Sequence, residues 1–250
     1  GRLCYDCYEN VRREEQGGGT LYGHHYKPVP HFLPNYKRGT LYLGVELEVD
    51  FLPTVSRTLS LFSAHPKYRV EFFTKEDGSL HNGGIEFVSH PATLAYHQQK
   101  FGWDNYCKMF HDQGGKSHYT DTCGVHVHFS REFFSDDAIE QDSCVLKMLY
   151  LMEEAFWDKF LNFSRRNPDK LNYTRPYMQK FKDMTQSQLD VLKGHGDRYR
   201  TINLQNFTTY EVRLFRGTLN HVTLLAAIEL VDYMARLAKD MTSAHLHRWT

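Results

Sequence analysis

Charged side chains recur at every second residue in several segments of the chain. Glu46, Glu48 and Asp50 alternate with apolar residues, and His126 and His128 do the same further along. In an extended strand, residues two apart share one face and lie about 7 Å from each other. Each segment would therefore present acidic or imidazole groups to one side of a sheet. Two shorter patterns extend the set, namely Glu211 with Arg213 and, in another segment, Glu86.

Carboxylates that lie close together repel one another. Two of them about 7 Å apart repel by roughly 2 kcal/mol at an effective dielectric constant near 20. Several such pairs would offset much of the roughly 5–15 kcal/mol that stabilises a domain. Either these groups face bulk water on an ordinary wetted sheet, or a cation neutralises them. Carboxylate oxygens with one imidazole suit Mg²⁺ or Mn²⁺, whereas Zn²⁺ prefers two or three His or Cys ligands.

The strands that would carry these groups follow from the same alternation. Predicted strands cover residues 41–51, 69–74, 85–89, 123–130, 200–204 and 209–215. Because they alternate and are not apolar throughout, we predict an antiparallel sheet with one polar face, in an α+β fold.

Helices are predicted between and after these strands. Residues 93–112 are expected to be helical, and a long helix is expected from Asp136 to just before Pro168, because apolar residues recur there at three- and four-residue spacing. A short helix is predicted at 186–193, where Gly194 would end it. The last helix carries Leu224, Ile228, Val231 and Ala235 on one face.

An ordered set of short motifs resembles those of the amidoligases, relatives of glutamine synthetase and glutamate–cysteine ligase. The motifs are GVELE from Gly44, DGSL from Asp77, GIEFVSHP from Gly84, CGVHVHFS from Cys123, RTINL from Arg200 and YEVRLFRGT from Tyr210. The resemblance spans residues 41–220, and each motif alone would be weak. It implies a mostly antiparallel, curved sheet with helices packed on one side, which forms half of a funnel that ATP enters from one end.

The resemblance also implies metal ligands, residue by residue. One metal ion, bridging the terminal phosphates of ATP, would be held by Glu46, His126 and Glu211. A second ion, near the acceptor carboxylate, would be held by Glu48, Glu86 and Asp77. Asp77 is matched by the DGSL motif alone.

Four arginines and one histidine are the implied contacts to nucleotide and substrate. Arg213 would meet the transferred γ-phosphoryl group or the substrate carboxylate. Arg216, with Arg198 or Arg200, would contact phosphate or substrate. His128 matches the second histidine of the H-x-H motif, for which a role beside the ligands or at the substrate is implied in preference to direct ligation.

The implied reaction is ATP-dependent formation of an amide or peptide bond. A carboxylate attacks the γ-phosphorus of ATP to give an acyl phosphate, and an amine then displaces phosphate. An amino acid, a peptide or a protein would supply carboxylate and amine. Because an acyl phosphate hydrolyses readily, water must be excluded. The polar segment 167–196 is the expected lid, and an ordinary surface loop is the alternative.

Two other functions fit part of the pattern. His126, His128 and a carboxylate could bind Zn²⁺ in a hydrolase, which would leave three carboxylates unused. A non-catalytic member that binds nucleotide or a peptide is the second alternative. The run Gly114-Gly115-Lys116-Ser117 resembles the end of a P-loop, but Phe110 stands where that motif requires Gly. We therefore expect Lys116 to be solvated.

The composition argues against several classes. Thirty Lys and Arg balance 30 Asp and Glu, so the net charge of 0 does not indicate a nucleic-acid partner. The longest apolar run, residues 222–231, contains Glu229 and is too short to span a membrane. Five cysteines, three of them isolated, argue against a disulfide framework and favour a reducing, cytoplasmic environment.

The first 19 residues are expected to be separate from a catalytic domain at 20–250. Cys4 and Cys7 have the C-x-x-C spacing of half a zinc ribbon, and a glycine-rich linker follows. We expect a truncated ribbon, because some phage and bacterial amidoligases carry one ahead of the ligase domain. Alternatively, His24 and His25 would complete a Zn²⁺ site with the two cysteines.

Overall fold

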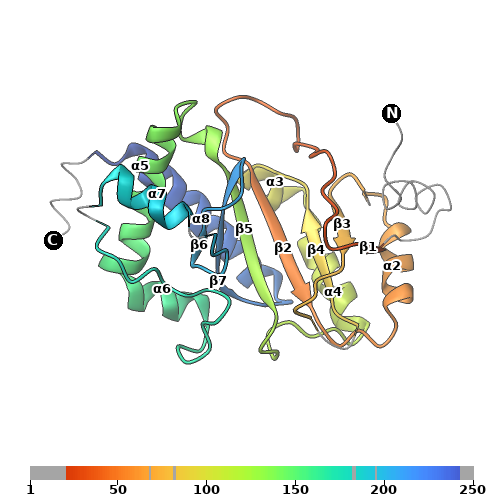
Figure 1. Ribbon diagram of the computed structural model, residues 1–250. Coiled ribbons are helices and arrows are strands. Elements are labelled where there is room, and N and C mark those ends of the chain that lie inside the picture. Colours follow the sequence, from red (N-terminus) through yellow and green to blue (C-terminus); the bar gives the residue numbers. More distant parts are fainter. Residues whose placement is uncertain (1–20, 68, 81–82, 182–183, 195, 243–250) are drawn as a thin grey trace.

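A seven-stranded sheet runs through the centre of the molecule (Figure 1). The computed structural model describes residues 21–67, 69–80, 83–181, 184–194 and 196–242 of the chain. Cys4 and Cys7, with the whole segment 1–19, lie outside these residues, so the zinc ribbon stays a prediction.

The sheet confirms the predicted α+β class. Its strands are β1 (Leu21–Tyr22), β2 (Leu43–Val49), β3 (Phe72–Lys75), β4 (Ile85–Ser89), β5 (Gly124–Ser130), β6 (Ile202–Asn203) and β7 (Thr209–Arg216). Their order across the sheet is β1-β3-β4-β2-β5-β7-β6. Every neighbouring pair is antiparallel except β1 and β3. The six predicted strands are all present with ends shifted by a few residues, and β1 was not predicted.

Strand β2 shows why the two faces of the sheet differ. Leu43, Val45 and Leu47 are completely buried and belong to the same hydrophobic core as Leu224 and Ile228 in the last helix. Burying such a side chain stabilises the fold by about 1.5–3 kcal/mol. The residues between them point to the opposite face, because side chains alternate along a strand. The apolar half of the pattern therefore fixes which side the charged half takes.

The helices cover the apolar face and one edge of the sheet. They are α2 (Val55–Ser63), α3 (Leu94–Gln99), α4 (Trp103–Asp112), α5 (Ala138–Leu149), α6 (Trp157–Ser164), α7 (Gln186–Gly194) and α8 (His221–Asp240), with a 3₁₀ turn at Arg131–Phe133. Helix α8 packs against β5 and β2, with α3, α4 and α5 beside it (Figure 1). None of the described helices combines the length and apolar character that a bilayer crossing requires.

Two predicted helices are interrupted. The helix expected at 93–112 is divided into α3 and α4, because the chain turns at Phe101 and Gly102. The long helix expected from Asp136 begins at its N-cap Asp137, whose carboxylate accepts the N–H groups of Ile139 and Glu140. It then passes through a π-helical stretch, Tyr150–Ala155, before α6. Helix α2 was not predicted.

The segment expected to form a lid is anchored to the body of the protein. Tyr177 and Phe181 are buried, and the Tyr177 hydroxyl donates a hydrogen bond to the Ile202 carbonyl at 2.9 Å. The backbone N–H groups of Tyr177 and Phe181 donate to Glu153 and Glu154 of the π-helical stretch, each at 2.7 Å. Helix α7 occupies the end of this segment, as predicted.

Candidate functional site

Acidic and imidazole side chains from four neighbouring strands converge on the charged face of the sheet. They are Glu46 and Glu48 on β2, Glu86 on β4, His126 and His128 on β5, and Glu211 on β7. Glu48, Glu86, His126 and Glu211 are each at most 4% exposed. The charged face is therefore not an ordinary wetted surface, which was the simplest alternative from the sequence.

Strand register brings these residues together. Glu46 lies opposite His126 in the β2–β5 pair, and Glu48 lies opposite Glu86 in the β2–β4 pair. His128 lies opposite Glu211 in the β5–β7 pair. Directly opposed residues of antiparallel strands have their Cβ atoms about 4.5–5.5 Å apart. The alternation along each strand and the pairing between strands together produce the cluster.

His126 lies at the centre of the cluster. Its Nδ1 atom is 3.2 Å from Glu46 Oε2 and 3.5 Å from Glu211 Oε1. Its Nε2 atom is 3.8 Å from Glu48 Oε1. One imidazole thus contacts carboxylates from two neighbouring strands, β2 and β7.

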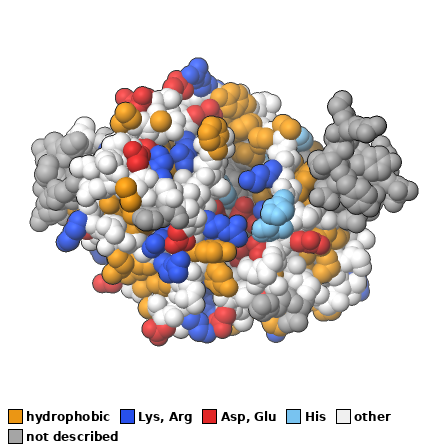
Figure 2. All heavy atoms as spheres, in the orientation of Figure 1, with side chains coloured by type: hydrophobic (Ala, Val, Ile, Leu, Met, Phe, Trp, Pro, Cys, Tyr) orange, Lys and Arg blue, Asp and Glu red, His pale blue; other side chains and the backbone are white. Residues whose placement is uncertain are grey.

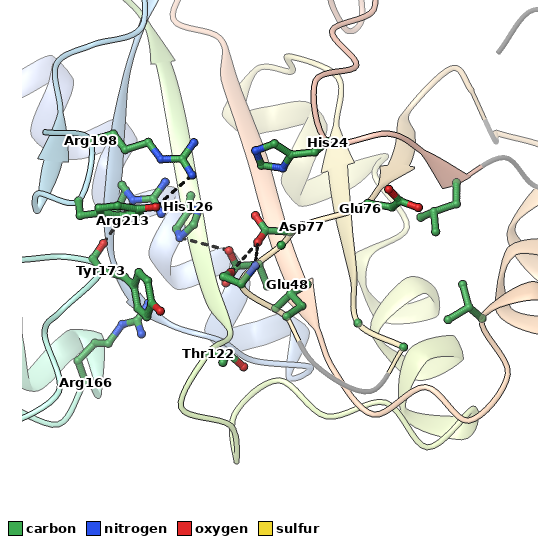
Figure 3. Close-up of a pocket in the computed structure, with 18 residues that line it drawn as sticks. His24, Glu48, Glu76, Asp77, Thr122, His126, Arg166, Tyr173, Arg198 and Arg213 are labelled. Carbon is green, nitrogen blue, oxygen red and sulfur yellow. Dashed lines mark hydrogen bonds and ion pairs between the residues drawn. The ribbon is translucent and has the colours of Figure 1, made fainter. Parts of the chain in front are cut away.

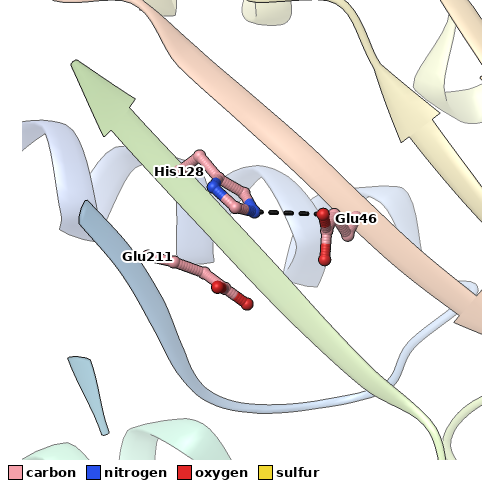
Figure 4. Close-up of side chains that lie close together, drawn as sticks. All are labelled: Glu46, His128 and Glu211. Carbon is pink, nitrogen blue, oxygen red and sulfur yellow. Dashed lines mark ion pairs between the residues drawn. The ribbon is translucent and has the colours of Figure 1, made fainter. Parts of the chain in front are cut away.

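His128 joins the same carboxylates. Its Nε2 atom lies 3.1 Å from Glu46 Oε1, and Figure 4 shows His128, Glu46 and Glu211 pointing toward one another from three neighbouring strands. The resemblance implied a place for His128 beside the ligands. In the structure, it lies as close to the carboxylates as His126 does.

The charges in the cluster are only partly balanced. Burial would raise the pKa of Glu46, but His128 and His126 hold that pKa well below its usual range. Burial would also raise the pKa of Glu211, but His128 and Arg213 lower it below the ordinary value. For Glu86 burial prevails, and with the negative charge of Glu46 it raises the pKa well above the ordinary value. Burial also raises the pKa of Glu48. The cluster favours additional positive charge.

Lys75 on β3 supplies part of that charge. Its Nζ atom lies 3.0 Å from Glu86 Oε2 and 3.9 Å from Glu46 Oε1. Burial would lower the pKa of Lys75, but the two carboxylates raise it. Lys75 was not chosen from the sequence. It directly follows the predicted strand 69–74, and its alternation with the buried Phe72 and Thr74 was the available signal.

The cluster fits a divalent cation. Two groups, Glu46 with His128 and Glu211, and Glu46 with Glu86 and His126, each offer three ligand atoms within 4.8 Å of one another. Ligands about 2.1 Å from one octahedral ion lie about 3 Å apart, so small side-chain movements suffice. Glu86 Oε2 and His128 Nε2 are buried without a hydrogen bond, although each has a charged neighbour. Two carboxylates with one imidazole match Mg²⁺ or Mn²⁺ better than Zn²⁺.

Glu211 is held from several sides. The Asn203 side-chain amide on β6 donates to Glu211 Oε2 at 2.8 Å, and Asn206 donates to the same oxygen at 3.2 Å. Arg213 forms an ion pair with Glu211 Oε1. Asn203 was not chosen from the sequence, although it lies within the RTINL motif. These interactions fix the position of the Glu211 carboxylate. One of them comes from β6, so the site also depends on the correct placement of that strand.

A cleft of about 900 Å³ opens on one side of the cluster. Figure 2 shows the hollow in which cationic, acidic and histidine side chains meet, and Figure 3 shows the residues that line it. Glu48 and His126 form part of its floor. Asp77 also lines the cleft, and its carboxylate accepts the N–H of Ser79 at 2.6 Å. His24, an alternative zinc ligand from the sequence, lines the same cleft.

The opposite wall of the cleft is cationic. Arg166, Arg198 and Arg213 line it together with Tyr173 and Tyr199 (Figure 3). Burial, opposed by the charge of Glu48, lowers the pKa of Arg166. The sequence predicted Arg198 and Arg213 as contacts but missed Arg166, which lies just beyond the end of α6.

Gly124 makes the approach of Arg166 possible. A Cβ atom at this position would lie 2.6 Å from Arg166 Nη2, 2.9 Å from His126 Nε2 and 3.4 Å from Glu48 Oε2. The Gly124 N–H also donates a hydrogen bond to Glu48 Oε2. Only a residue without a side chain allows these three groups to converge here.

A second cavity, of about 640 Å³, lies on the other side of the cluster and has a different character. Its aromatic lining comes from Phe32, Tyr36, Tyr42 and Phe207. His128 also lines it, so this aromatic groove and the polar cleft meet at the carboxylate cluster.

Two predicted contacts lie elsewhere. Arg216 does not line the cleft or the aromatic groove among the described residues, and it borders a cavity next to Arg165. Arg200 packs its guanidinium 5.0 Å from the ring centre of Tyr177 and pairs with Asp197 at 2.9 Å. Arg216 is the last residue of β7 and lies opposite Gly124 at the end of the sheet, and Arg200 precedes β6 in irregular chain.

Comparison with protein-family models and with curated proteins finds no match for this chain.

Proposed function

We propose that this protein is an ATP-dependent carboxylate–amine ligase of the amidoligase type. The observation that carries the proposal is the buried carboxylate and imidazole cluster, which lies between the polar cleft and the aromatic groove. Such a ligase must bring a nucleotide and a carboxylate to one place from two directions. The mostly antiparallel sheet would supply the curved half-funnel that the resemblance implies.

Two metal ions would be held on the sheet. Glu46, His128 and Glu211, with His126 beside them, form the group nearer the aromatic groove, and Glu86 and Glu48 extend it toward the cleft. Bound there, Mg²⁺ or Mn²⁺ would screen the negative charges of the phosphates and of the acceptor carboxylate. Asp77 lines the same cleft as Glu48. It would complete the ligands of the second metal ion.

The nucleotide base would occupy the aromatic groove. Phe207, on the turn between β6 and β7, is 95% exposed and lines this groove. An exposed aromatic ring beside a cavity provides a stacking surface that every purine can use. With the base here, the terminal phosphates would extend over the charged cluster toward the cleft.

The acceptor carboxylate would enter the polar cleft. Arg166, Arg198 and Arg213 offer guanidinium groups along one wall, and arginine binds a carboxylate through paired hydrogen bonds. Glu76 and Asp77 on the opposite wall could accept hydrogen bonds from an ammonium group. This division of charge suits an amino acid or a peptide end.

The reaction follows from this placement. An oxygen of the acceptor carboxylate attacks the γ-phosphorus of ATP, ADP leaves, and an acyl phosphate forms. The amine nitrogen then attacks the acyl carbon, loses a proton and expels phosphate, which retains one oxygen from the carboxylate. Arg213, paired with Glu211 and open to the cleft, stabilises the charge on the transferred phosphoryl group.

Cysteine chemistry finds no support in the described residues. Cys107, Cys123 and Cys144 are buried thiols, and burial raises the pKa of Cys123 to about 12. A thiolate nucleophile needs a lowered pKa. The carboxylate cluster remains the chemically competent part of the site.

Oxygen-isotope transfer tests the proposal. Pools of amino acids and peptides are screened with ATP and Mg²⁺ for phosphate release and product mass, and the active acceptor is then supplied with ¹⁸O in its carboxylate. We expect one ¹⁸O atom in each phosphate released. A zinc hydrolase would release product without ATP, and a binding protein would give neither. Either result, with no ¹⁸O transfer for any pool, would contradict the ligase.

A further inference from the structure

The loop between α4 and β5 encloses a separate cavity of about 750 Å³. Lys116, Ser117 and His118 of this loop line it, together with Arg165 at the end of α6. The beginning of α8 closes the remaining side. This cavity shares no lining residue with the polar cleft or the aromatic groove.

The lining of this cavity carries unbalanced positive charge. None of the described residues that line it is acidic, whereas Lys116, Arg165, His111 and His118 are basic. Arg165 and Lys116 form no ion pair within the described part of the chain. Burial and the nearby Arg216 lower the pKa of Arg165, and burial with Arg216 and Arg165 lowers the pKa of His118. His111 lies 3.7 Å from the Asp112 carboxylate, so Lys116 and Arg165 are the cations of this lining without an acidic partner among the described residues.

Ser117 provides an independent sign of a missing ligand. It lines the cavity and is only 2% exposed, and its hydroxyl is buried without a hydrogen-bond partner. Gly217 makes room for this hydroxyl, since a Cβ there would lie 2.3 Å from Ser117 Oγ. Burying an unpaired hydroxyl costs about 1–3 kcal/mol, so an acceptor at this place would be stabilised.

Helix α8 points its N-terminus at the same cavity. It is 20 residues long, and its N-cap Asn220 and the first-turn residue Thr223 line the cavity. The Asn220 side chain accepts the Thr223 N–H at 3.1 Å. The preceding N–H groups of His221 and Val222 have no carbonyl acceptor within the helix. They add partial positive charge at this end of α8.

We propose that this cavity is a second anion site, which binds a phosphate group carried by a free ion or by a small phosphate ester. Lys116 and Arg165 supply charge, the Ser117 hydroxyl donates a hydrogen bond, and the first-turn amides of α8 complete the site. The site is independent of the ligase proposal, because none of its residues belongs to the carboxylate cluster.

The site is connected to the cluster through the backbone. Lys116 exchanges two backbone hydrogen bonds with Asp50, at 2.7 and 2.8 Å, just beyond β2. Arg165 in this cavity is followed directly by Arg166 in the polar cleft. An anion that orders the loop would therefore also fix the end of β2 and the start of the segment after α6.

Phosphate titration followed by amide NMR shifts tests the site. Inorganic phosphate and glycerol phosphate are added separately, with a chelator present to remove divalent cations. We expect saturable shifts of the Ser117, His118, His221 and Val222 amides with at least one of the two ligands. Lys116→Ala combined with Arg165→Asn should weaken this binding at least tenfold. Asn tolerates the positive φ of 59° at residue 165.

Matched variants separate this site from the cleft and from general charge effects. Ser117→Ala, a smaller change, should weaken binding several-fold, while Lys116→Arg retains it. Arg57→Ala removes an exposed cation on α2, and Arg198→Ala removes an exposed cation from the cleft; both should bind phosphate at this site as the unaltered protein does. No shift in the first turn of α8 with either ligand, or equal binding by the Lys116/Arg165 variant in its folded state, would overturn the proposal.

Discussion

Glu46 belongs to both groups of side chains that could hold a metal ion. Its two carboxylate oxygens face different histidines, with His126 at 3.2 Å and His128 at 3.1 Å. Those imidazoles keep the pKa of Glu46 well below its ordinary range despite burial. A carboxylate that stays ionised between two candidate ion positions is the residue on which a paired metal site would depend most.

Glu46→Gln and Glu211→Gln should each reduce ATP turnover at least about 100-fold, since each removes a charged ligand from the site. Each should also lower the thermal unfolding midpoint, because the lowered pKa values of Glu46 and Glu211 mean that their ionised forms stabilise the fold, but both variants should remain folded. Turnover with the active acceptor and calorimetry measure the two effects. Glu229→Gln, on the exposed face of α8, is the control. Turnover close to normal in both variants would remove the assigned ligands.

Gly124→Ala should impair the site while leaving the protein folded. The new Cβ would lie 2.6 Å from Arg166 Nη2 and 2.9 Å from His126 Nε2, so both groups must move. We expect a loss of about 1 kcal/mol in unfolding free energy and about tenfold lower turnover. Gly194→Ala, where a Cβ meets nothing within 4 Å, serves as the comparison. Full turnover in Gly124→Ala would show that the convergence at this glycine is unimportant.

At the scale of elements, the π-helical stretch Tyr150–Ala155 places a half-buried glutamate, Glu153, against the segment 171–181. Burial raises the pKa of Glu153 to about 7, against the lowering effect of hydrogen bonds from Thr201 and the Tyr177 backbone. The ordinary value is 4.5. Between these two values the folded state binds more protons than the unfolded state. The free energy of unfolding must therefore fall as pH rises through this window.

Glu153→Gln should flatten that pH dependence, because glutamine carries no proton to lose. The variant is expected to remove a decline of at most about 3 kcal/mol between about pH 4.5 and pH 7. Urea unfolding at several pH values measures it. Glu229→Gln should keep the decline of the unaltered protein, and a decline of the same size in Glu153→Gln would contradict the assignment.

The turn between β6 and β7 carries the exposed ring of Phe207. If this ring stacks on the base, Phe207→Ala should weaken ATP binding about tenfold, because base–aromatic stacking contributes about 1–3 kcal/mol. The binding of triphosphate alone should be unchanged. Calorimetric titration with Mg²⁺ present measures both. Val29→Ala shortens another exposed apolar side chain outside the groove. Equal losses in both variants would argue against stacking.

The periodic spacing of apolar residues predicted where strands and helices lie, but it did not predict where two of the helices are interrupted. The alternation of Leu43, Val45 and Leu47 was sufficient to place β2 and its charged face. One interruption is the break at Phe101 and Gly102, and the other is the π-helical stretch. Both depend on how α4 and α6 pack on the core, which cannot be inferred from the spacing of residues in the sequence. Helix α2 and the two-residue β1 lack a strong repeat of their own.

At the scale of the whole molecule, the candidate site depends on strand order. Glu86, Glu46, His126 and Glu211 are dispersed along the sequence, but β4, β2, β5 and β7 are consecutive in the sheet. Alternation predicted which face each side chain takes, and the motif resemblance suggested their convergence. Arg166 and Lys75 were missed because they reach the site from outside the matched motifs. Arg216, the last residue of β7, and Arg200, which precedes β6, do not line the cleft, and the motifs alone do not indicate this.

The central claim is that these four strands hold divalent cations, and Mn²⁺ binding followed by electron paramagnetic resonance tests it most directly. The free-ion signal should fall saturably as protein is added, and ATP should tighten the binding. Glu46→Gln should weaken Mn²⁺ binding at least about tenfold, while Glu229→Gln binds normally. No saturable binding by the unaltered protein, or identical binding by Glu46→Gln, would contradict the account.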